Sequence, residues 1–245
     1  MPVTAPVTYF ILSVCCVVYG ISLLFTIHSG FPTTPEGGSM LGKLFDIGGV
    51  AAPVLERLGA SLPLDIDLRE PWRLVTACFL HANLLHIVFN MWVFVDLAPT
   101  IEELYGSSRF FFIYIVCGIG GYILSGFFGH FSIGASGAIV GLIGVLLAIT
   151  YRRGGAGMQQ LSSNVYKWII YLVVWGFLFP GVDNMAHLGG GITGFILGKL
   201  MVDRAPATPS ERKLAYALGW IAAAAMLASF GFMLFTGGRS IFLRR

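Results

Sequence analysis

Apolar residues along this 245-residue chain gather into seven segments, separated by polar or glycine-rich stretches. Most segments reach the roughly 17–25 residues that a helix needs to cross the hydrocarbon core of a bilayer. They cover residues 7–27, 74–97, 109–129, 134–151, 165–180, 184–202 and 214–236. The pattern predicts an all-α membrane protein with seven transmembrane helices.

The longest connection, residues 28–71, begins with glycine and proline and then mixes apolar with charged positions. It is too polar for a full span, and its apolar positions argue against a free linker. We expect it to lie in the headgroup region of the membrane. It ends at Trp72 and Arg73, an aromatic and a cation that suit the membrane–water boundary.

Composition strengthens the membrane interpretation. Hydrophobic residues make up 56% of the chain and charged residues only 11%, whereas soluble domains carry about 25% charged residues. The first apolar segment lacks a basic start and is longer than the core of a signal peptide, so we expect a retained helix. The net charge of +3 is not clustered, which excludes nucleic acid as an expected partner.

The four cysteines lack the spacing of a zinc site, and we interpret them as small buried hydrophobes. They are Cys15, Cys16, Cys78 and Cys117. We therefore expect no metal and no organic cofactor.

Basic residues in the short loops indicate the topology, because Lys and Arg favour the cytoplasmic side. All fall on one side of the predicted spans: Arg109, Arg152, Arg153, Lys167, Lys199, Arg204, Arg212 and Lys213. The acidic 28–71 loop then lies outside, with the N-terminus inside and the C-terminus outside. Arg239, Arg244 and Arg245 oppose this assignment, and they would lie inside if segment 214–236 did not span.

Four polar residues stand out within the apolar segments. Ser136 lies between glycines at the start of segment 134–151, His86 and Asn90 share one helix face, and His187 lies near the start of segment 184–202. Polar groups inside a bilayer are costly and are functional candidates by default. His81, which has no partner evident from the sequence, is interpreted as structural.

Small residues predict which of these segments meet. Segment 134–151 carries Gly137, Gly141, Gly144 and Ala148 on one face, and segment 184–202 carries Gly190, Gly194 and Gly198. Such faces let two transmembrane backbones approach closely. Their packing would bring Ser136 and His187 together at one depth.

This combination predicts a Ser–His dyad. A serine hydroxyl becomes a good nucleophile when a base takes its proton, and His187 can be that base. Asp96 lies too far toward the inner end and Asp183 falls in the outer turn, so no third member is assigned. The side chains of His86 and Asn90, with the backbone near Gly134 and Ala135, would stabilise an oxyanion. The G-x-S-x-G elbow of soluble hydrolases is excluded, because position 138 is alanine.

Five motifs now resemble the rhomboid intramembrane serine proteases, over about residues 7–202. They are Trp72-Arg73, His81…His86-Ile87-Val88-Phe89-Asn90, Glu102…Gly106 in the next loop, Gly134-Ala135-Ser136-Gly137 and Ala186-His187-Leu188-Gly189-Gly190. Val140 departs from members that place a tyrosine there.

The resemblance implies a catalytic six-helix core over residues 1–202, with an interfacial first loop at 28–73. Residues 203–245 would add a cytoplasmic loop, a seventh transmembrane helix and a tail. Ser136 would be the nucleophile and His187 the general base. The site would open to the extracytoplasmic side and cut transmembrane protein substrates near the outer end of their helix.

Two alternative functions fit the sequence less well than a protease does. A catalytically inactive relative that binds membrane clients usually lacks the serine or the histidine, and both are present here. A transporter would show paired polar positions in two halves of the chain, and none is found. We expect a multi-pass protein of a prokaryotic plasma or inner membrane; the sequence does not indicate the oligomeric state.

Overall fold

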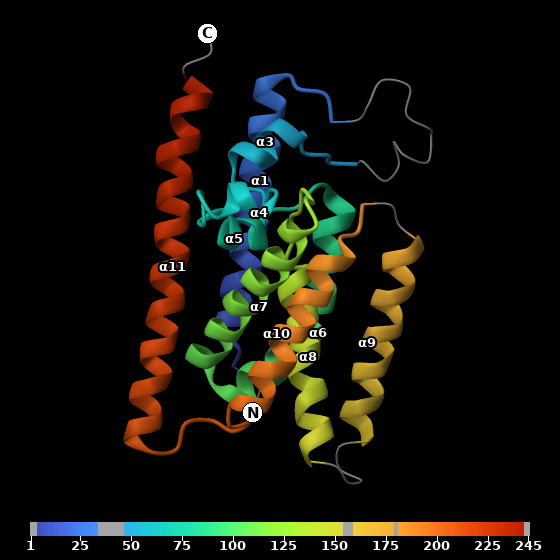
Figure 1. Ribbon diagram of the computed structural model, residues 1–245, viewed down its shortest axis with the longest axis vertical. Coiled ribbons are helices and arrows are strands. Elements are labelled where there is room, and N and C mark those ends of the chain that lie inside the picture. The colour runs from blue at the N-terminus through green and yellow to red at the C-terminus, as the bar shows by residue number, and fades with distance from the viewer. Residues whose placement is uncertain (1–3, 34–46, 154–158, 179–180, 243–245) are drawn as a thin grey trace.

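The chain forms an upright bundle of long helices, shown in Figure 1. This computed structural model describes residues 4–33, 47–153, 159–178 and 181–242. The long helices are α1 (Pro6–Ser29), α6 (Leu84–Tyr105), α7 (Ser107–Phe127), α8 (Ser136–Arg153), α9 (Gln159–Leu178), α10 (Asn184–Leu200) and α11 (Pro209–Phe242). Within these ranges there is no strand, only an isolated bridge between Ser61 and Ser132. The predicted all-α polytopic fold is confirmed.

Five of the helices, α1, α6, α7, α8 and α11, are long and apolar enough to cross a membrane by length and composition. These helices differ in how much of their apolar surface is buried inside the protein. In α7 and α8, 61% of the most apolar stretch is buried inside the protein, against 22% in α11. The centre of the bundle is therefore α7 and α8, and α11 lies at its edge with most of its apolar surface toward lipid.

The predicted span 74–97 was wrong at its start. Residues up to Phe79 form two short helices, α5 (Arg73–Thr76) and η1 (Ala77–Phe79), and α6 begins only at Leu84. The side chain of Asn83 caps α6 by accepting a hydrogen bond from the His86 N–H at 2.8 Å. The apolar side chains of residues 74–80 are buried against protein, not lipid. Hydropathy alone does not separate these two environments.

Two further residues lie elsewhere than expected. His81 precedes α6 instead of belonging to its outer end; it is fully buried, with its ring 5.1 Å from that of His86. Glu102 lies in the last turn of α6, not in a loop. Its carboxylate accepts hydrogen bonds from the backbone N–H groups of Val7 and Thr8 at 3.0 and 2.8 Å, and from the hydroxyl of Ser107 at 2.6 Å. One side chain thus fastens the ends of α1, α6 and α7 together.

The first loop packs on one end of the bundle through α3 (Ala52–Arg57), α4 (Leu64–Asp67) and α5. Arg73 holds it there. Its guanidinium donates to the carbonyls of Glu56 and Ala60 at 2.6 and 3.1 Å, and lies 4.6 Å from the Trp72 ring. Part of the expected interfacial loop, residues 34–46, lies outside the described residues.

Basic residues gather at the opposite end. Arg152 and Arg153 pair with Asp203 at 3.1 and 2.5 Å, and Arg109 donates to the Arg204 carbonyl at 3.3 Å. Helix α11 then runs the whole height of the bundle and ends beside the first loop (Figure 1). The last three residues of the tail, 243–245, fall outside the described part.

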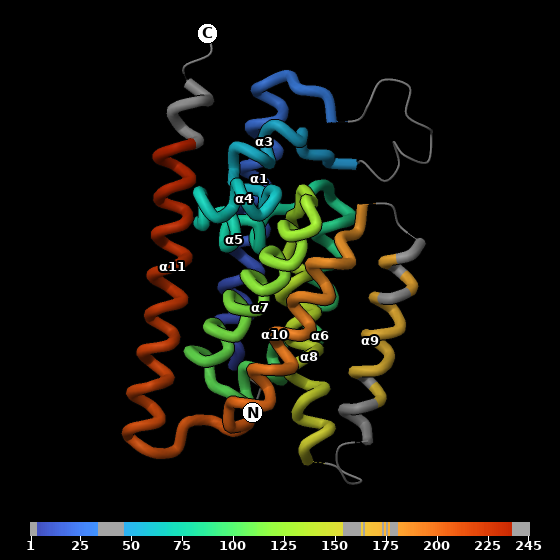
Figure 2. Tube along the Cα trace, in the orientation of Figure 1, coloured from blue at the N-terminus to red at the C-terminus, as the bar shows by residue number. Residues whose placement is uncertain are grey.

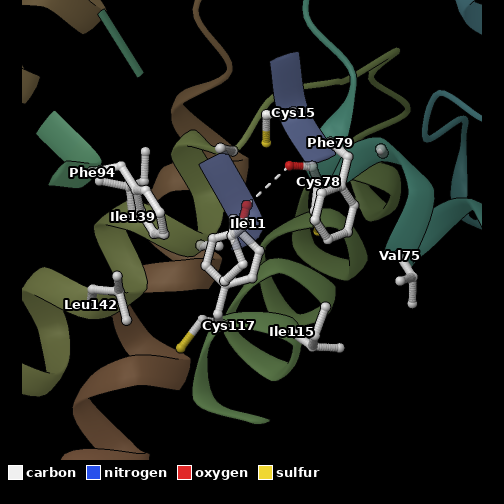
Figure 3. Close-up of a cluster of buried hydrophobic side chains, with 14 of the residues drawn as sticks. Ile11, Cys15, Val75, Cys78, Phe79, Phe94, Ile115, Cys117, Ile139 and Leu142 are labelled. Atoms are coloured by element: carbon white, nitrogen blue, oxygen red, sulfur yellow. Dashed lines mark hydrogen bonds between the residues drawn. The ribbon is translucent and has the colours of Figure 1, made fainter. Parts of the chain in front are cut away.

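The core between α1, α6, α7 and α8 is apolar and closely packed. Figure 3 shows three cysteines in it, Cys15, Cys78 and Cys117, beside Ile11 and Phe79. All four cysteines are free, and these three are buried as predicted, whereas Cys16 is exposed on the lipid-facing side of α1. Within the described ranges, no group of three or more His, Cys, Asp or Glu side chains could hold a metal ion.

Candidate active site

Ser136 is the first residue of α8, and the turn before it is held on two sides. The Gly134 N–H donates to the Ala77 carbonyl at 2.9 Å, and the Gly134 carbonyl accepts from the Tyr122 hydroxyl at 2.5 Å. Gly134 has a φ of +122°, which only glycine adopts readily. Ala135 is fully buried. The turn before Ser136 is therefore fixed in position, and α8 begins at the serine.

His86 meets this turn. A Cβ atom at Gly134 would lie 2.8 Å from His86 Nε2 and 3.7 Å from Ser136 Oγ. The His86 imidazole and the Ser136 hydroxyl therefore both lie next to the space above the Gly134 Cα. Any side chain at position 134 would occupy it.

The hydrogen bonding of His86 indicates its tautomer. The Ala82 N–H donates to His86 Nδ1 at 3.4 Å, so Nδ1 acts as the acceptor and a neutral ring carries its proton on Nε2. That N–H is the side that faces Gly134. His86 thus presents a donor beside Ser136, as an oxyanion site requires.

Asn90 lies one turn deeper in α6 and is 7% exposed. Its amide donates to the His86 carbonyl at 2.8 Å, which ties the side chain to its own helix. Among the hydrogen bonds of the described residues, none joins Asn90 to Ser136. His86 thus lies against the turn of the serine, whereas the amide of Asn90 is hydrogen-bonded within its own helix.

His187 lies in the first turn of α10, and Asp183 caps that helix. The Asp183 carboxylate accepts from the N–H groups of Met185 and Ala186, both at 3.0 Å, and its carbonyl accepts from the His187 N–H at 3.1 Å. The position of His187 is therefore fixed by the start of the helix.

Helices α8 and α10 meet through their backbones, as the glycine faces predicted. A Cβ at Gly190 would overlap the Gly137 carbonyl, and a Cβ at Gly194 would overlap the Gly141 carbonyl. At the outer end of the same contact, a Cβ at Gly137 would lie 3.4 Å from the Ala186 carbonyl. This helix pair has the most extensive contact in the bundle.

The contact sets the depth of both candidate residues. Gly137 directly follows Ser136, and Ala186 directly precedes His187. Since a Cβ at Gly137 would come within 3.4 Å of the Ala186 carbonyl, the first turns of α8 and α10, which carry the serine and the histidine, adjoin near the end of the bundle with the first loop.

Two residues near the site were not assigned a role from the sequence. Asp183 was considered but left out of the dyad, and Tyr122 was not considered. Asp183 also accepts from the Ser125 hydroxyl and from His130 Nδ1, the latter at 3.1 Å. Burial alone would raise the pKa of Asp183, but hydrogen bonds from Ser125, Ser132, Ala186 and His130 hold it below its usual value. These hydrogen bonds join the carboxylate to the end of α7, the loop before α8 and the start of α10. Tyr122 has no sequence signal beyond a polar group in an apolar segment.

Asp96, the other acidic residue considered, lies on α6 toward the inner end. It accepts a hydrogen bond from Trp168 Nε1 of α9 at 2.9 Å. It contributes to packing between α6 and α9, well removed from the serine.

Comparison with known proteins identifies the family to which the chain is similar. A family model described as "Rhomboid domain" matches residues 68–204. The chain is 37% identical over 161 residues to "RHOMBOID-like protein 6, mitochondrial" of Arabidopsis thaliana, a match that covers 63% of this chain and 52% of the relative.

Two further relatives are named as proteases. "Rhomboid protease GluP" of Bacillus subtilis (strain 168) is 36% identical over 149 residues, covering 60% of this chain and 29% of the relative. "Rhomboid-like protease 1" of Toxoplasma gondii is 35% identical over 158 residues, covering 61% and 54%. The chain thus matches about half or less of the length of these relatives.

Proposed function

This chain belongs to the rhomboid family, and from that premise we propose that it is an intramembrane serine endopeptidase with Ser136 as nucleophile and His187 as general base. The observation that supports the proposal is the close approach of the first turns of α8 and α10, where a Cβ at Gly137 would lie 3.4 Å from the Ala186 carbonyl. Rhomboid proteins include serine proteases, and their substrates span the bilayer.

The proposed reaction uses the groups already described. Ser136 Oγ attacks the carbonyl carbon of the scissile peptide bond while His187 takes the hydroxyl proton. The negative oxygen of the tetrahedral intermediate then lies near the Nε2–H of His86 and the unpaired N–H groups at the start of α8. His187 returns the proton to the leaving amine, and a water molecule hydrolyses the acyl-enzyme by the reverse sequence of steps.

Asn90 is proposed to stabilise the oxyanion less strongly than His86 does. Its side chain is bound to the His86 carbonyl, one turn below the imidazole. It would act on the oxyanion through its remaining N–H or by fixing His86. Loss of one oxyanion donor typically costs about 10²–10³-fold in kcat, and Asn90→Ala is expected at or below the lower end of this range.

The substrate is proposed to be a transmembrane helix that unwinds near its outer end. A helix in lipid hides its peptide bonds in internal hydrogen bonds, so cleavage requires local unwinding. The candidate residues lie at the end that carries the first loop, opposite the basic end. By the positive-inside rule the site opens to the extracytoplasmic side. We assign the activity to residues 1–202, with α11 as an addition packed on α5 and α7.

The long apolar helices place the chain in a membrane, but the relatives do not specify which one. They come from a plant, a bacterium and a parasite, and one is named mitochondrial. The expectation of a prokaryotic plasma or inner membrane gains no support from them.

Labelling with a fluorophosphonate probe in liposomes tests the proposal. Wild type should be labelled and should cleave a transmembrane reporter, whereas Ser136→Ala and His187→Ala should do neither. Both variants should keep the melting temperature of wild type. A folded wild type that is neither labelled nor active would favour the alternative, a rhomboid-like protein that binds membrane clients without cutting them.

A further inference from the structure

The two candidate catalytic residues are each preceded, at four residues' distance, by a polar residue at the outer end of the bundle. Ser132 precedes Ser136, and Asp183 precedes His187. The Asp183 carboxylate lies where the end of α7, the loop into α8 and the start of α10 come together. Its side chain is 13% exposed.

The carboxylate receives hydrogen bonds from all three segments. Oδ1 accepts from Met185 and Ala186 of α10 and lies 3.1 Å from Nδ1 of His130 in the loop. Oδ2 accepts from the Ser125 hydroxyl of α7. An N-cap needs only the first two of these bonds. The others connect separate elements, so Asp183 does more than begin a helix.

The loop into α8 is also fixed from its other side. Ser132 and Ser61 exchange two backbone hydrogen bonds, both 3.0 Å long. The Ser61 hydroxyl in turn donates to Asp67 at 2.6 Å, and Asp67 accepts the Leu62 N–H at 3.0 Å. The segment that leads to Ser136 is therefore held between the first loop and α10.

We propose that Asp183 is a positioning residue, which sets His187 against Ser136 by binding the start of α10 to α7 and to the loop before α8. The proposal rests on the proposed function, since it assumes that these two residues react together. Asp183 touches neither the substrate nor the reacting atoms. Its role is to reduce the freedom of the first turn of α10, where a displacement of about 1 Å can cost about 10²-fold in rate.

The lowered pKa of Asp183 agrees with this role. Although burial opposes the charge, the hydrogen bonds from Ser125, Ser132, Ala186 and His130 favour the ionised form. A charged acceptor forms stronger hydrogen bonds than a neutral one. The connection is therefore strongest with the carboxylate ionised.

Asp183→Ser is the variant that separates capping from cross-linking. Serine is a good N-cap but is too short to reach Ser125 and His130 as well. We expect a folded protein in which kcat and the rate of fluorophosphonate labelling of Ser136 fall by about 10–100-fold, with KM for the transmembrane reporter unchanged. Asp183→Asn, which keeps the size and one acceptor oxygen, should recover part of the loss.

Asp203→Asn is the matched control, because it removes an acid that follows the inner end of the same helix and binds Arg152 and Arg153. It should keep the wild-type labelling rate. His130→Ala should lower the rate less than Asp183→Ser, since the backbone donors to Oδ1 remain.

A double-mutant cycle with Ser125→Ala gives the sharpest test. Ser125→Ala alone should slow labelling, and the double variant Asp183→Ser with Ser125→Ala should be no slower than Asp183→Ser. Additive losses, or a wild-type rate in folded Asp183→Ser, would contradict the proposal while leaving the proposed function standing. If Asp183→Ser does not fold, Ser125→Ala decides alone, and a wild-type rate in it contradicts the proposal. An inert wild type would contradict the proposed function and this inference with it.

Discussion

Helices α9 and α10 both lie beside α8, but they are attached to the bundle in different ways. Helix α10 meets α8 through backbone atoms, with Gly190 and Gly194 against the carbonyls of Gly137 and Gly141. Helix α9 stands at the edge of the bundle, as Figure 2 shows, and is joined to α6 through large side chains. Trp168 packs edge-on against Trp92 at 5.8 Å and donates to Asp96.

This difference matters because side chains change rotamers and backbones do not. A contact through aromatic rings can rearrange at little cost, whereas two helix backbones in contact leave no room to move. The candidate nucleophile and base are carried by α8 and α10, the pair with the closest contact. We infer that the two candidate residues are held in a preorganised position.

Gly194→Val should give the largest effect. Its Cβ would overlap the Gly141 carbonyl, and overpacking a closely packed contact typically costs about 1–3 kcal/mol or more. We expect a lower melting temperature and loss of cleavage. Gly231→Ala in α11 is the control, since nothing lies within 4 Å of its added Cβ. Equal melting temperatures for both variants would show that the α8–α10 contact is not rigid.

Gly134→Ala should mainly affect activity. The added Cβ would come 2.8 Å from His86 Nε2 and would sit on a backbone with φ of +122°. Displacement of the donor beside Ser136 should lower kcat by about 10²-fold. Gly30→Ala, which also has positive φ but open space around it, controls for backbone strain. A labelling rate as high as that of Gly30→Ala would remove His86 from the site.

Trp168→Phe tests the other side of the comparison. It deletes the hydrogen bond to Asp96 but keeps an aromatic ring in the cluster. An exposed hydrogen bond contributes on the order of 1 kcal/mol, so the melting temperature should fall by a few degrees at most and the labelling rate should stay near that of wild type. A loss as large as that of Gly194→Val would mean that α9 is as tightly fixed as α10.

Acid should lower the stability of the folded protein by protonating Asp183, and this effect should be the smallest of the four predicted here. The folded pKa of this carboxyl is depressed, so the unfolded chain binds its proton more readily than the folded protein. The stabilisation is complete above the ordinary pKa of about 3.9 and is lost as pH falls through the folded value. Melting curves of wild type and Asp183→Asn should converge in that acidic range. A difference that grows on acidification would contradict the assignment.

Much of this arrangement could be predicted, because transmembrane packing leaves its mark on sequence. The glycine faces of residues 137–148 and 190–198 predicted the contact of α8 with α10, and that contact was confirmed. The start of α11 carries a capping signal that the prediction of residues 214–236 did not use. Thr208 and Glu211 form a reciprocal capping box, with bonds of 3.2 Å in both directions, at the start of a helix predicted five residues too late.

What could not be predicted depends on contacts between distant segments. Residues 74–80 are as apolar as a membrane span, but they are buried inside the protein, mainly against α7 and α11, so the start of α6 was misplaced. Asp183 was assigned only to the outer turn, and the sequence does not show that Ser125 and His130 come to it. The roles of Ser136, His187, His86 and Asn90, and the division at residue 202, stay predictions.

The hydrogen bonds from Val7 and Thr8 to the Glu102 carboxylate have a consequence for folding during synthesis. The amide hydrogens of Val7 and Thr8 that bind this carboxylate precede it by 95 and 94 residues. While α1 enters the membrane, its first turn therefore has no such acceptor, and one arrives only when the last turn of α6 leaves the ribosome. Until that point the start of α1 lacks the carboxylate that fastens it to α6 and α7 in the folded protein.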